Sequence, residues 1–231
     1  MNDRIWYLQK CDLLGRLSAA QMSQIERVSQ IKVFPKSSAI YLPCQPADAI
    51  LLVAKGLVKI CHLNVDGRVA ILAFVRPGEL FGELSLFDSE QRGDYAEAAE
   101  ATTVVRIPRH ALQEVLQTNV ELAIGFTKLI GVRRQRVENR LRNLLFASNQ
   151  QRLIHLLLDL ADQFGVVVEE GIQLGLKLSH QELANLIGAT RESVTVLLGN
   201  MKRQGLIRGK RNDVILTDIQ RLAEIVGRSR S

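Results

Sequence analysis

The stretch that decides the C-terminal fold runs Leu178-Ser-His-Gln-Glu-Leu-Ala-Asn-Leu-Ile-Gly-Ala-Thr-Arg-Glu-Ser-Val-Thr-Val-Leu-Leu-Gly-Asn-Met-Lys202. Ser179 and Glu182 have the spacing of a capping box, which predicts a helix that begins after the serine. Gly188 suits a tight turn with positive φ, and Thr190 is a good N-cap for a second helix. Two capped helices joined by so short a turn predict a helix-turn-helix.

The second of these helices has one apolar face and one polar face. Val194, Leu197 and Met201 predict the buried side, which leaves Arg191 and Glu192 exposed near the N-terminus. Arginine can contact guanine in two places and glutamate can accept from cytosine, so this end suits the major groove. Residues 206–216 predict a hairpin wing. The predicted DNA contacts are Ser179, His180, Gln181, Thr190, Arg191, Glu192, Ser193, Thr195, Val196, Arg203, Lys210 and Arg211.

The apolar residues are spaced differently over residues 31–117. Short runs rich in Val, Ile and Leu alternate with turn signals, which predicts an antiparallel β-sandwich or barrel. Asp66-Gly67 is the strongest hairpin signal. A short helical lead precedes this region. The predicted class is α+β, with an N-terminal β-roll over 1–117, a long helix over 118–147 and a winged helix-turn-helix over 148–231.

The predicted long helix carries an apolar stripe with steps mostly of three and four, close to a coiled-coil seam. Its members are Leu122, Phe126, Leu129, Val132, Val137, Leu141 and Leu144. Two interpretations remain open at this point. The stripe either packs on its own β domain or pairs with a second copy of the chain, and the two are compatible.

Composition fits a globular protein that binds a polyanion. The chain has 231 residues, 47% of them hydrophobic, and a formal net charge of +6. No apolar run reaches the ~18 residues of a membrane span, and the N-terminus lacks a secretory signal, so we expect a cytoplasmic protein. Cys11, Cys44 and Cys61 are too few and too widely spaced for a disulfide framework or a metal site, which favours reduced thiols over a sensor.

At the helix-turn-helix residues the chain resembles the CRP/FNR family of bacterial transcription regulators. Segments such as Leu176-Lys-Leu-Ser-His-Gln and Thr190-Arg-Glu-Ser-Val-Thr-Val look most like the cyanobacterial nitrogen-control regulators of that family. The resemblance implies a homodimer on a palindromic site and an RNA polymerase partner. It also implies a second arginine five residues after Arg191, where this chain has Val196, so we expect an altered preference at one base pair.

Gly78-Glu-Leu-Phe-Gly-Glu-Leu-Ser-Leu-Phe followed by Arg92 resembles the phosphate-binding cassette of the family's cyclic-nucleotide binders. The resemblance implies an anionic effector near Gly82, Glu83, Leu84, Arg92, Arg133 and Glu138.

Cyclic AMP binders carry Ser or Thr after the arginine and Thr-Ser on the long helix, whereas here Gly93 and Val137-Glu138 occupy those positions. Arg133 and Glu138 match positions used around 2-oxoglutarate, yet Glu83 replaces an apolar residue. The effector is therefore left open between 2-oxoglutarate, a cyclic nucleotide, and another ligand or none. An internal ion pair between Arg92 and Glu83 is the alternative role for those two residues.

We weigh three functions. The first is an effector-modulated DNA-binding regulator, with activation or repression left open. The second is a cyclic-nucleotide-binding module that acts on a protein partner, against which the winged helix argues. The third, an enzyme, is disfavoured because the four histidines are scattered and no catalytic motif is present.

Overall fold

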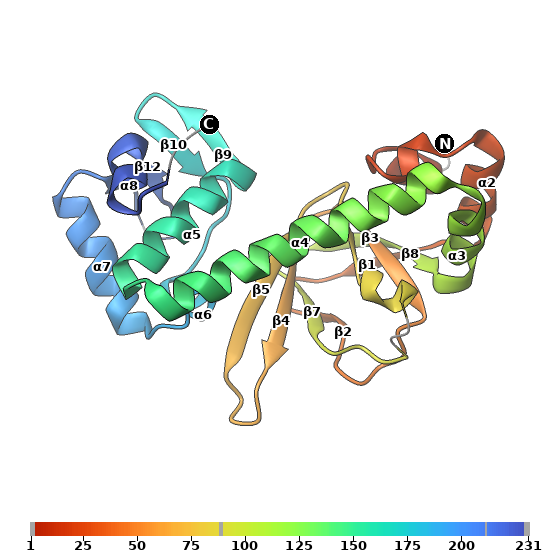
Figure 1. Cartoon of the computed structure of the whole chain (residues 1–231), viewed down its shortest axis with the longest axis horizontal. Helices are drawn as coiled ribbons and strands as arrows, with labels where there is room; N and C mark the ends of the chain where they lie inside the picture. The colour runs from red at the N-terminus through yellow and green to blue at the C-terminus, as the bar shows by residue number, and fades with distance from the viewer. Residues whose placement is uncertain (1–2, 88–89, 211, 229–231) are drawn as a thin grey trace. The chain divides into compact units, whose positions relative to one another are not determined.

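A computed structural model describes residues 3–87, 90–210 and 212–228 of the chain (Figure 1). The chain divides into two compact units, Met1–Arg133 and Arg134–Ser231. The boundary falls inside the long helix α4 (Val120–Phe146). No helix among the described residues is long and apolar enough to cross a membrane.

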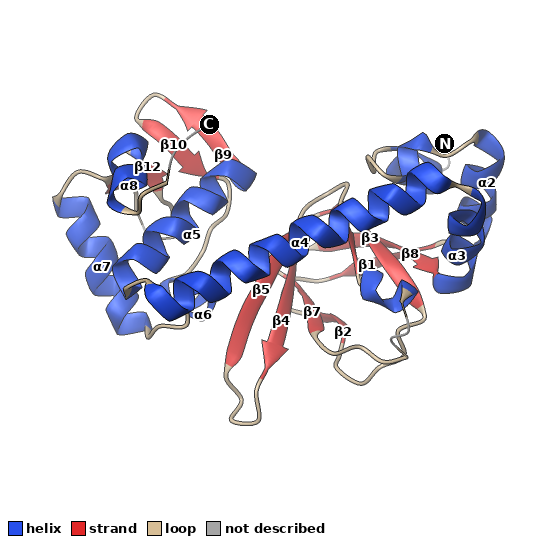
Figure 2. Ribbon diagram, in the orientation of Figure 1, coloured by secondary structure: helices blue, strands red, loops and turns tan. Residues whose placement is uncertain are grey.

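The N-terminal unit contains two antiparallel four-stranded sheets, shown as red arrows in Figure 2. The first has the order β1 (Gln30–Phe34), β8 (Thr102–Pro108), β3 (Ala49–Lys55) and β6 (Leu80–Phe81). The second has the order β2 (Ala39–Tyr41), β7 (Tyr95–Ala98), β4 (Val58–Leu63) and β5 (Val69–Val75). The predicted α+β class with an N-terminal β domain is confirmed.

Alternation along β3 places this unit's two cores on opposite faces of the first sheet. Leu51 and Val53 join the apolar cluster formed with residues of the second sheet, whereas Ile50 and Leu52 pack with the helices. Because successive side chains of a strand point to opposite faces, a fully apolar strand serves both cores. The helices are α1 (Asp3–Gln9), η1 (Leu14–Arg16), α2 (Ala19–Val28), η2 (Glu83–Leu86), α3 (Arg109–Thr118) and the first part of α4.

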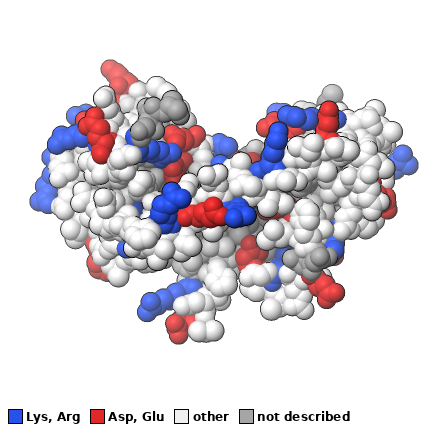
Figure 3. All heavy atoms as spheres, viewed as in Figure 1, with Lys and Arg blue, Asp and Glu red and all other residues white. Residues whose placement is uncertain are grey.

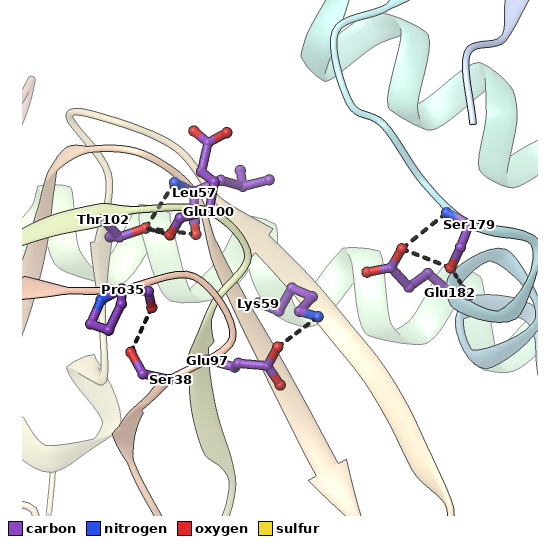
Figure 4. A network of polar contacts seen from close by, with 9 residues as sticks. All are labelled: Pro35, Ser38, Leu57, Lys59, Glu97, Glu100, Thr102, Ser179 and Glu182. Carbon is purple, nitrogen blue, oxygen red and sulfur yellow. Dashed lines mark hydrogen bonds and ion pairs between the residues drawn. The ribbon is translucent and has the colours of Figure 1, made fainter. Parts of the chain in front are cut away.

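Polar contacts fix the turns and pairs of the second sheet. Lys59 lies directly opposite Glu97 on the neighbouring strand, with 2.9 Å between Nζ and Oε1 (Figure 4). The hairpin predicted at Asp66-Gly67 joins β4 to β5. Asn64 holds this turn, because its side-chain oxygen accepts from the amides of Asp66 and Arg68 at 3.0 and 2.8 Å.

Three elements correct the sequence-based expectations. Residues 109–117, expected within the strand-rich stretch, belong to the helix α3 (Arg109–Thr118). The sequence of residues 171–178 also predicts a short strand pair. The pair observed is β9 (Gly165–Val168) against β10 (Gly171–Leu174), because the connection lies at Glu169-Glu170. A final helix, α8 (Ile219–Ile225), was not anticipated, although Asp218 caps it by accepting from the amide of Arg221 at 2.9 Å.

The C-terminal unit packs helices on a small sheet. Its elements are the rest of α4, α5 (Asn149–Phe164), β9, β10, α6 (His180–Ile187), α7 (Arg191–Arg203), β11 (Ile207–Arg208), β12 (Ile215–Leu216) and α8. The sheet order is β11-β12-β10-β9. The predicted hairpin wing is therefore present as β11 and β12.

Candidate nucleic-acid interface and effector cassette

Local capping sets where α6 begins. The amide of Glu182 donates to the Ser179 hydroxyl at 3.2 Å, and the Ser179 amide donates to the Glu182 carboxylate at 3.0 Å. Figure 4 shows the Glu182 side chain bent back toward Ser179. Each bond satisfies an amide that the first helical turn leaves open, so the expected capping box is confirmed.

A left-handed turn and a second cap then start α7. Gly188 has φ of 65°, a value that glycine adopts without steric cost. The Thr190 hydroxyl accepts from the amide of Ser193 at 3.2 Å. Leu183 and Ala184 of α6 and Val194 of α7 are buried, so the two helices pack through apolar faces. These parts form the helix-turn-helix that the sequence predicts.

The outer side of α7 presents the proposed base-reading residues. Arg191 and Glu192 are exposed in the first turn. Val196 is 61% exposed one turn further along. Figure 3 shows Lys and Arg atoms gathered at the edge of the C-terminal unit that carries α7 in Figure 1. An exposed helix N-terminus with adjacent positive charge suits a DNA groove.

The structure gives several predicted contact residues intramolecular partners. The hydroxyls of Ser179 and Thr190 are engaged in capping, and the Thr190 hydroxyl also lies 3.0 Å from the Ser193 hydroxyl. The Gln181 side-chain Nε2 donates to the side-chain oxygen of Asn185 at 2.8 Å. A phosphate contact from these side chains would therefore share or replace an existing hydrogen bond.

The wing is tied to α7 by a lysine. Lys202 Nζ donates to the carbonyl oxygen of Gly209 at 2.9 Å. The Arg203 guanidinium donates to the Asn200 side chain. Lys210 is exposed in the wing, while Arg211 lies outside the described residues.

A surface hollow lies among α6, α7 and the wing. It is lined by Ser179, His180, Gln181, Arg191, Lys202 and Asn212. Asn212 was missed from the sequence, although its φ of 64° belongs to the left-handed region that asparagine tolerates. The hollow brings the start of α6 together with both ends of α7, which are distant in sequence.

In the N-terminal unit, Gly82 and Arg92 meet as the cassette motif suggests. Gly82 has φ of 71°, and a Cβ there would clash with Nη1 of Arg92. The Arg92 guanidinium donates to the carbonyl oxygens of Gly82 (3.0 Å) and Ala49 and lies 4.5 Å from the Tyr41 ring centroid. Burial lowers the pKa of Arg92. Among the described residues its buried Nε atom has no hydrogen-bond partner, so this donor is not used within the cassette.

Glu83 does not pair with Arg92. Its buried carboxylate instead accepts a hydrogen bond from Arg133 of α4, which also donates to the Leu80 carbonyl oxygen. Leu84 is exposed. Glu138 belongs to the other unit and pairs with Arg134, with 2.7 Å between Nε and Oε1. The structure thus brings together Gly82, Glu83, Arg92 and Arg133.

The apolar stripe of α4 divides between two environments. Leu122 and Phe126 are buried in the helical core of the N-terminal unit. Val132, Val137, Leu141 and Leu144 are all exposed. The first part of the stripe packs on its own domain, as one interpretation expected, and the second part presents an apolar face along the helix.

The thiols and acidic groups form no metal site among the described residues. Cys11 and Cys61 are buried and Cys44 is exposed, and all three are free. Burial raises the pKa of Cys61 to about 11, which makes this thiol unreactive near neutral pH.

A capped helix-turn-helix with a basic exposed helix, together with a β-sandwich that carries a glycine–arginine cassette, defines a DNA-binding transcription regulator. Comparison with known families agrees. The cyclic nucleotide-binding domain matches residues 31–119, and the Crp-like helix-turn-helix domain matches residues 151–225.

Relatives of similar length support this assignment. A CRP-like cAMP-activated global transcriptional regulator of Mycobacterium tuberculosis is 30% identical, covering 89% of this chain and 90% of its own. A global nitrogen regulator of Synechococcus elongatus is 35% identical, covering 77% and 81%. A solved CRP/FNR regulator of Thermus thermophilus is 30% identical with a TM-score of 0.68, covering 87% and 100%. The chain belongs to the CRP/FNR family of transcription regulators, which are not enzymes.

Proposed function

We propose that this protein regulates transcription as a homodimer on a palindromic DNA site, under the control of a small anionic effector. Residues 1–117 would sense the effector, 118–147 would form the dimer and 148–231 would bind DNA. The observation that carries the proposal is the exposed first turn of α7. Arg191 and Glu192 are solvent-exposed there, while the rest of the helix packs against its unit. The cytoplasm is the expected compartment and RNA polymerase the expected protein partner.

Docking follows from which end of α7 is exposed. Val194 and Met201 hold the rest of the helix to its unit, whereas Arg191 and Glu192 are exposed in the first turn, so the N-terminal end of the helix is left to enter the major groove. Arg191 would bond guanine and Glu192 would accept from cytosine. Arg203 and Lys210 would neutralise backbone phosphates, which position the protein without specifying sequence.

Homodimer formation is supported by the exposed half of the α4 stripe. Val137 and Leu141 are 63% and 54% exposed and lie one turn apart on the same face. Several large apolar side chains in a row on a solvent-facing helix favour pairing with a partner helix. Two copies would present two α7 helices, so the DNA site is expected to have two-fold symmetry.

The effector would lie at the cassette. Arg92 provides a guanidinium beside Gly82, and its unused Nε donor suits an anion. Cyclic nucleotides are supported by the domain match and by the name of the M. tuberculosis relative, and 2-oxoglutarate by the likeness to nitrogen regulators. The Glu83–Arg133 pair would oppose a dicarboxylate, because the ligand would meet a carboxylate that is already in place.

Selection from a random duplex library tests the proposed DNA function. The full-length chain is expected to enrich a two-fold symmetric motif whose half-sites lie about one helical turn apart. Enrichment of an asymmetric motif would contradict the homodimer, and no enrichment would contradict sequence-specific binding.

Thermal unfolding with cyclic AMP, cyclic GMP or 2-oxoglutarate tests the effector. A true ligand raises the melting temperature progressively with its concentration. Arg92→Gln is expected to abolish that increase. A flat response to all three would contradict both proposed effector classes.

A further inference from the structure

His180 and Thr195 join the two helices of the DNA-binding motif through a hydrogen bond whose direction can be assigned. Nδ1 of His180 lies 2.8 Å from Oγ1 of Thr195. The Thr195 hydroxyl also donates to the carbonyl oxygen of Arg191 at 2.8 Å. A hydroxyl has one hydrogen, and a carbonyl can only accept. With that hydrogen on the Arg191 carbonyl, the Thr195 oxygen offers Nδ1 only lone pairs, so we assign the ring hydrogen to Nδ1.

This assignment makes Nε2 the nitrogen that gains or loses a proton. In neutral His180, Nε2 presents a lone pair. In the imidazolium form it presents an N–H donor and a positive charge. A phosphate oxygen bears only lone pairs at neutral pH, so it is repelled by the first form and bound by the second. The hydrogen bond to Thr195 holds the ring through its other nitrogen in both states.

The surroundings of His180 are those of an anion site. Two cationic side chains of α7, Arg191 and Lys202, line the hollow with it, and the wing contributes the uncharged Asn212. On its own helix, the carboxylate of Glu182 is engaged by the amide and hydroxyl of Ser179 at 3.0 and 2.9 Å. Lys202 is held toward the wing by its bond to Gly209.

Burial and these groups also favour the neutral form of His180 when no anion is bound. Burial, then repulsion by Lys202 and Arg191, lowers the pKa of His180 below its ordinary value. A phosphate that enters the hollow beside His180 and Lys202 reverses this balance, because its negative charge favours the imidazolium. Binding of the anion and protonation of the ring then assist each other, and thermodynamic linkage requires the assistance to be reciprocal.

We propose that His180 is a proton-linked contact to the DNA backbone: a phosphate of the duplex occupies the hollow, and each subunit takes up one proton at Nε2 on binding. This inference rests on the DNA-binding function proposed above. It predicts that affinity falls as pH rises, by up to about tenfold per pH unit for each subunit between the pKa values of the free and bound states.

The first test compares DNA affinity across about pH 6 to 8, the range in which histidines titrate. Fluorescence anisotropy would follow the full-length chain on a mixed-sequence duplex at constant ionic strength. His180→Gln keeps an amide donor but cannot titrate, so its affinity is expected to change much less with pH than that of the wild type. His155→Gln is the matched control, because His155 is a half-buried histidine of α5 whose pKa is also lowered by burial.

The outcomes separate this inference from the function on which it rests. Equal pH dependence in the wild type and His180→Gln would overturn the inference while leaving DNA binding intact. Loss of the wild-type pH dependence in His155→Gln would overturn it too. Failure of the wild type to bind duplex at any pH would instead contradict the proposed function.

Nitrogen NMR of the four histidines provides a readout that does not depend on affinity. Free His180 at high pH is expected to show the tautomer with hydrogen on Nδ1, and its titration midpoint should rise when duplex is added. The opposite tautomer or an unchanged midpoint would overturn the inference. Inorganic phosphate at the same phosphate concentration should raise the midpoint less, and an equal rise would overturn the assignment to DNA.

Discussion

Arg133, in the middle of α4, donates hydrogen bonds to the carboxylate of Glu83 and to the carbonyl oxygen of Leu80. The carboxylate is buried and the guanidinium is half-buried. The pair therefore fastens the long helix to the cassette within the N-terminal unit. A buried carboxylate that loses its partner is costly, because neither water nor another cation replaces it.

Arg133→Met is expected to lower the free energy of unfolding by about 2 kcal/mol, since Glu83 would remain buried without its cation. Adding Glu83→Gln should recover part of this loss. Urea unfolding of the two single variants and the double variant gives the coupling between the side chains. Arg134→Met, which breaks the exposed pair with Glu138, is the control and should change stability little. Strictly additive effects of Arg133→Met and Glu83→Gln would contradict the pairing.

Leu141→Glu is expected to convert the proposed dimer to monomer, because it places a charge within the apolar face of α4. Sedimentation velocity would measure the change. Asn139→Glu adds the same charge about half a helical turn away, on the side of α4 away from Val137, Leu141 and Leu144, and should leave the dimer intact. A monomeric wild type, or dissociation by both variants alike, would count against the α4 seam.

One thiol of three should react rapidly with an aromatic disulfide reagent at mildly alkaline pH. Cys44 is exposed, whereas burial raises the pKa of both Cys11 and Cys61. The thiolate is the reactive form, so the two buried thiols should react only as the protein unfolds. Cys44→Ser should remove the rapid phase. A rapid phase that survives this change would show that a buried cysteine is accessible.

Val196→Arg should change the preferred half-site at one base pair. Val196 is exposed on α7, five residues after Arg191, where the resemblance implies a second arginine. An arginine there could bond guanine and add about 1–3 kcal/mol of discrimination. Repeating the duplex selection with this variant measures the effect. An unchanged motif would show that position 196 does not reach a base.

The helix-turn-helix could be predicted because its signals are local. Ser179 with Glu182, Gly188 and Thr190 each act on the backbone within a few residues, and the structure bears out each of them. The same holds for the hairpin at Asp66-Gly67. Short-range hydrogen bonds and φ preferences are determined by residues that are close in the sequence, so a single sequence is enough to identify them.

The parts that were missed depend on contacts distant in sequence. An ion pair between Arg92 and Glu83 is the alternative role that the sequence allows, but Arg92 donates to backbone carbonyl oxygens and Glu83 accepts from Arg133, fifty residues away. The partner of a charged side chain is set by tertiary packing, which spacing does not reveal. Helix α3 was missed because its ten residues follow a strand directly, with Pro108 as the only boundary signal.

The most direct test of the central claim is the affinity of Arg191→Ala for the selected duplex and for a shuffled duplex of the same composition. Arg191→Ala is expected to lose about 1–3 kcal/mol of binding free energy on the selected site and less on the shuffled one, and to relax the preference at one base pair. Arg221→Ala, which removes an exposed arginine of α8, is the control and should retain specificity. Unchanged specific binding by Arg191→Ala would contradict the claim that α7 reads DNA through this residue.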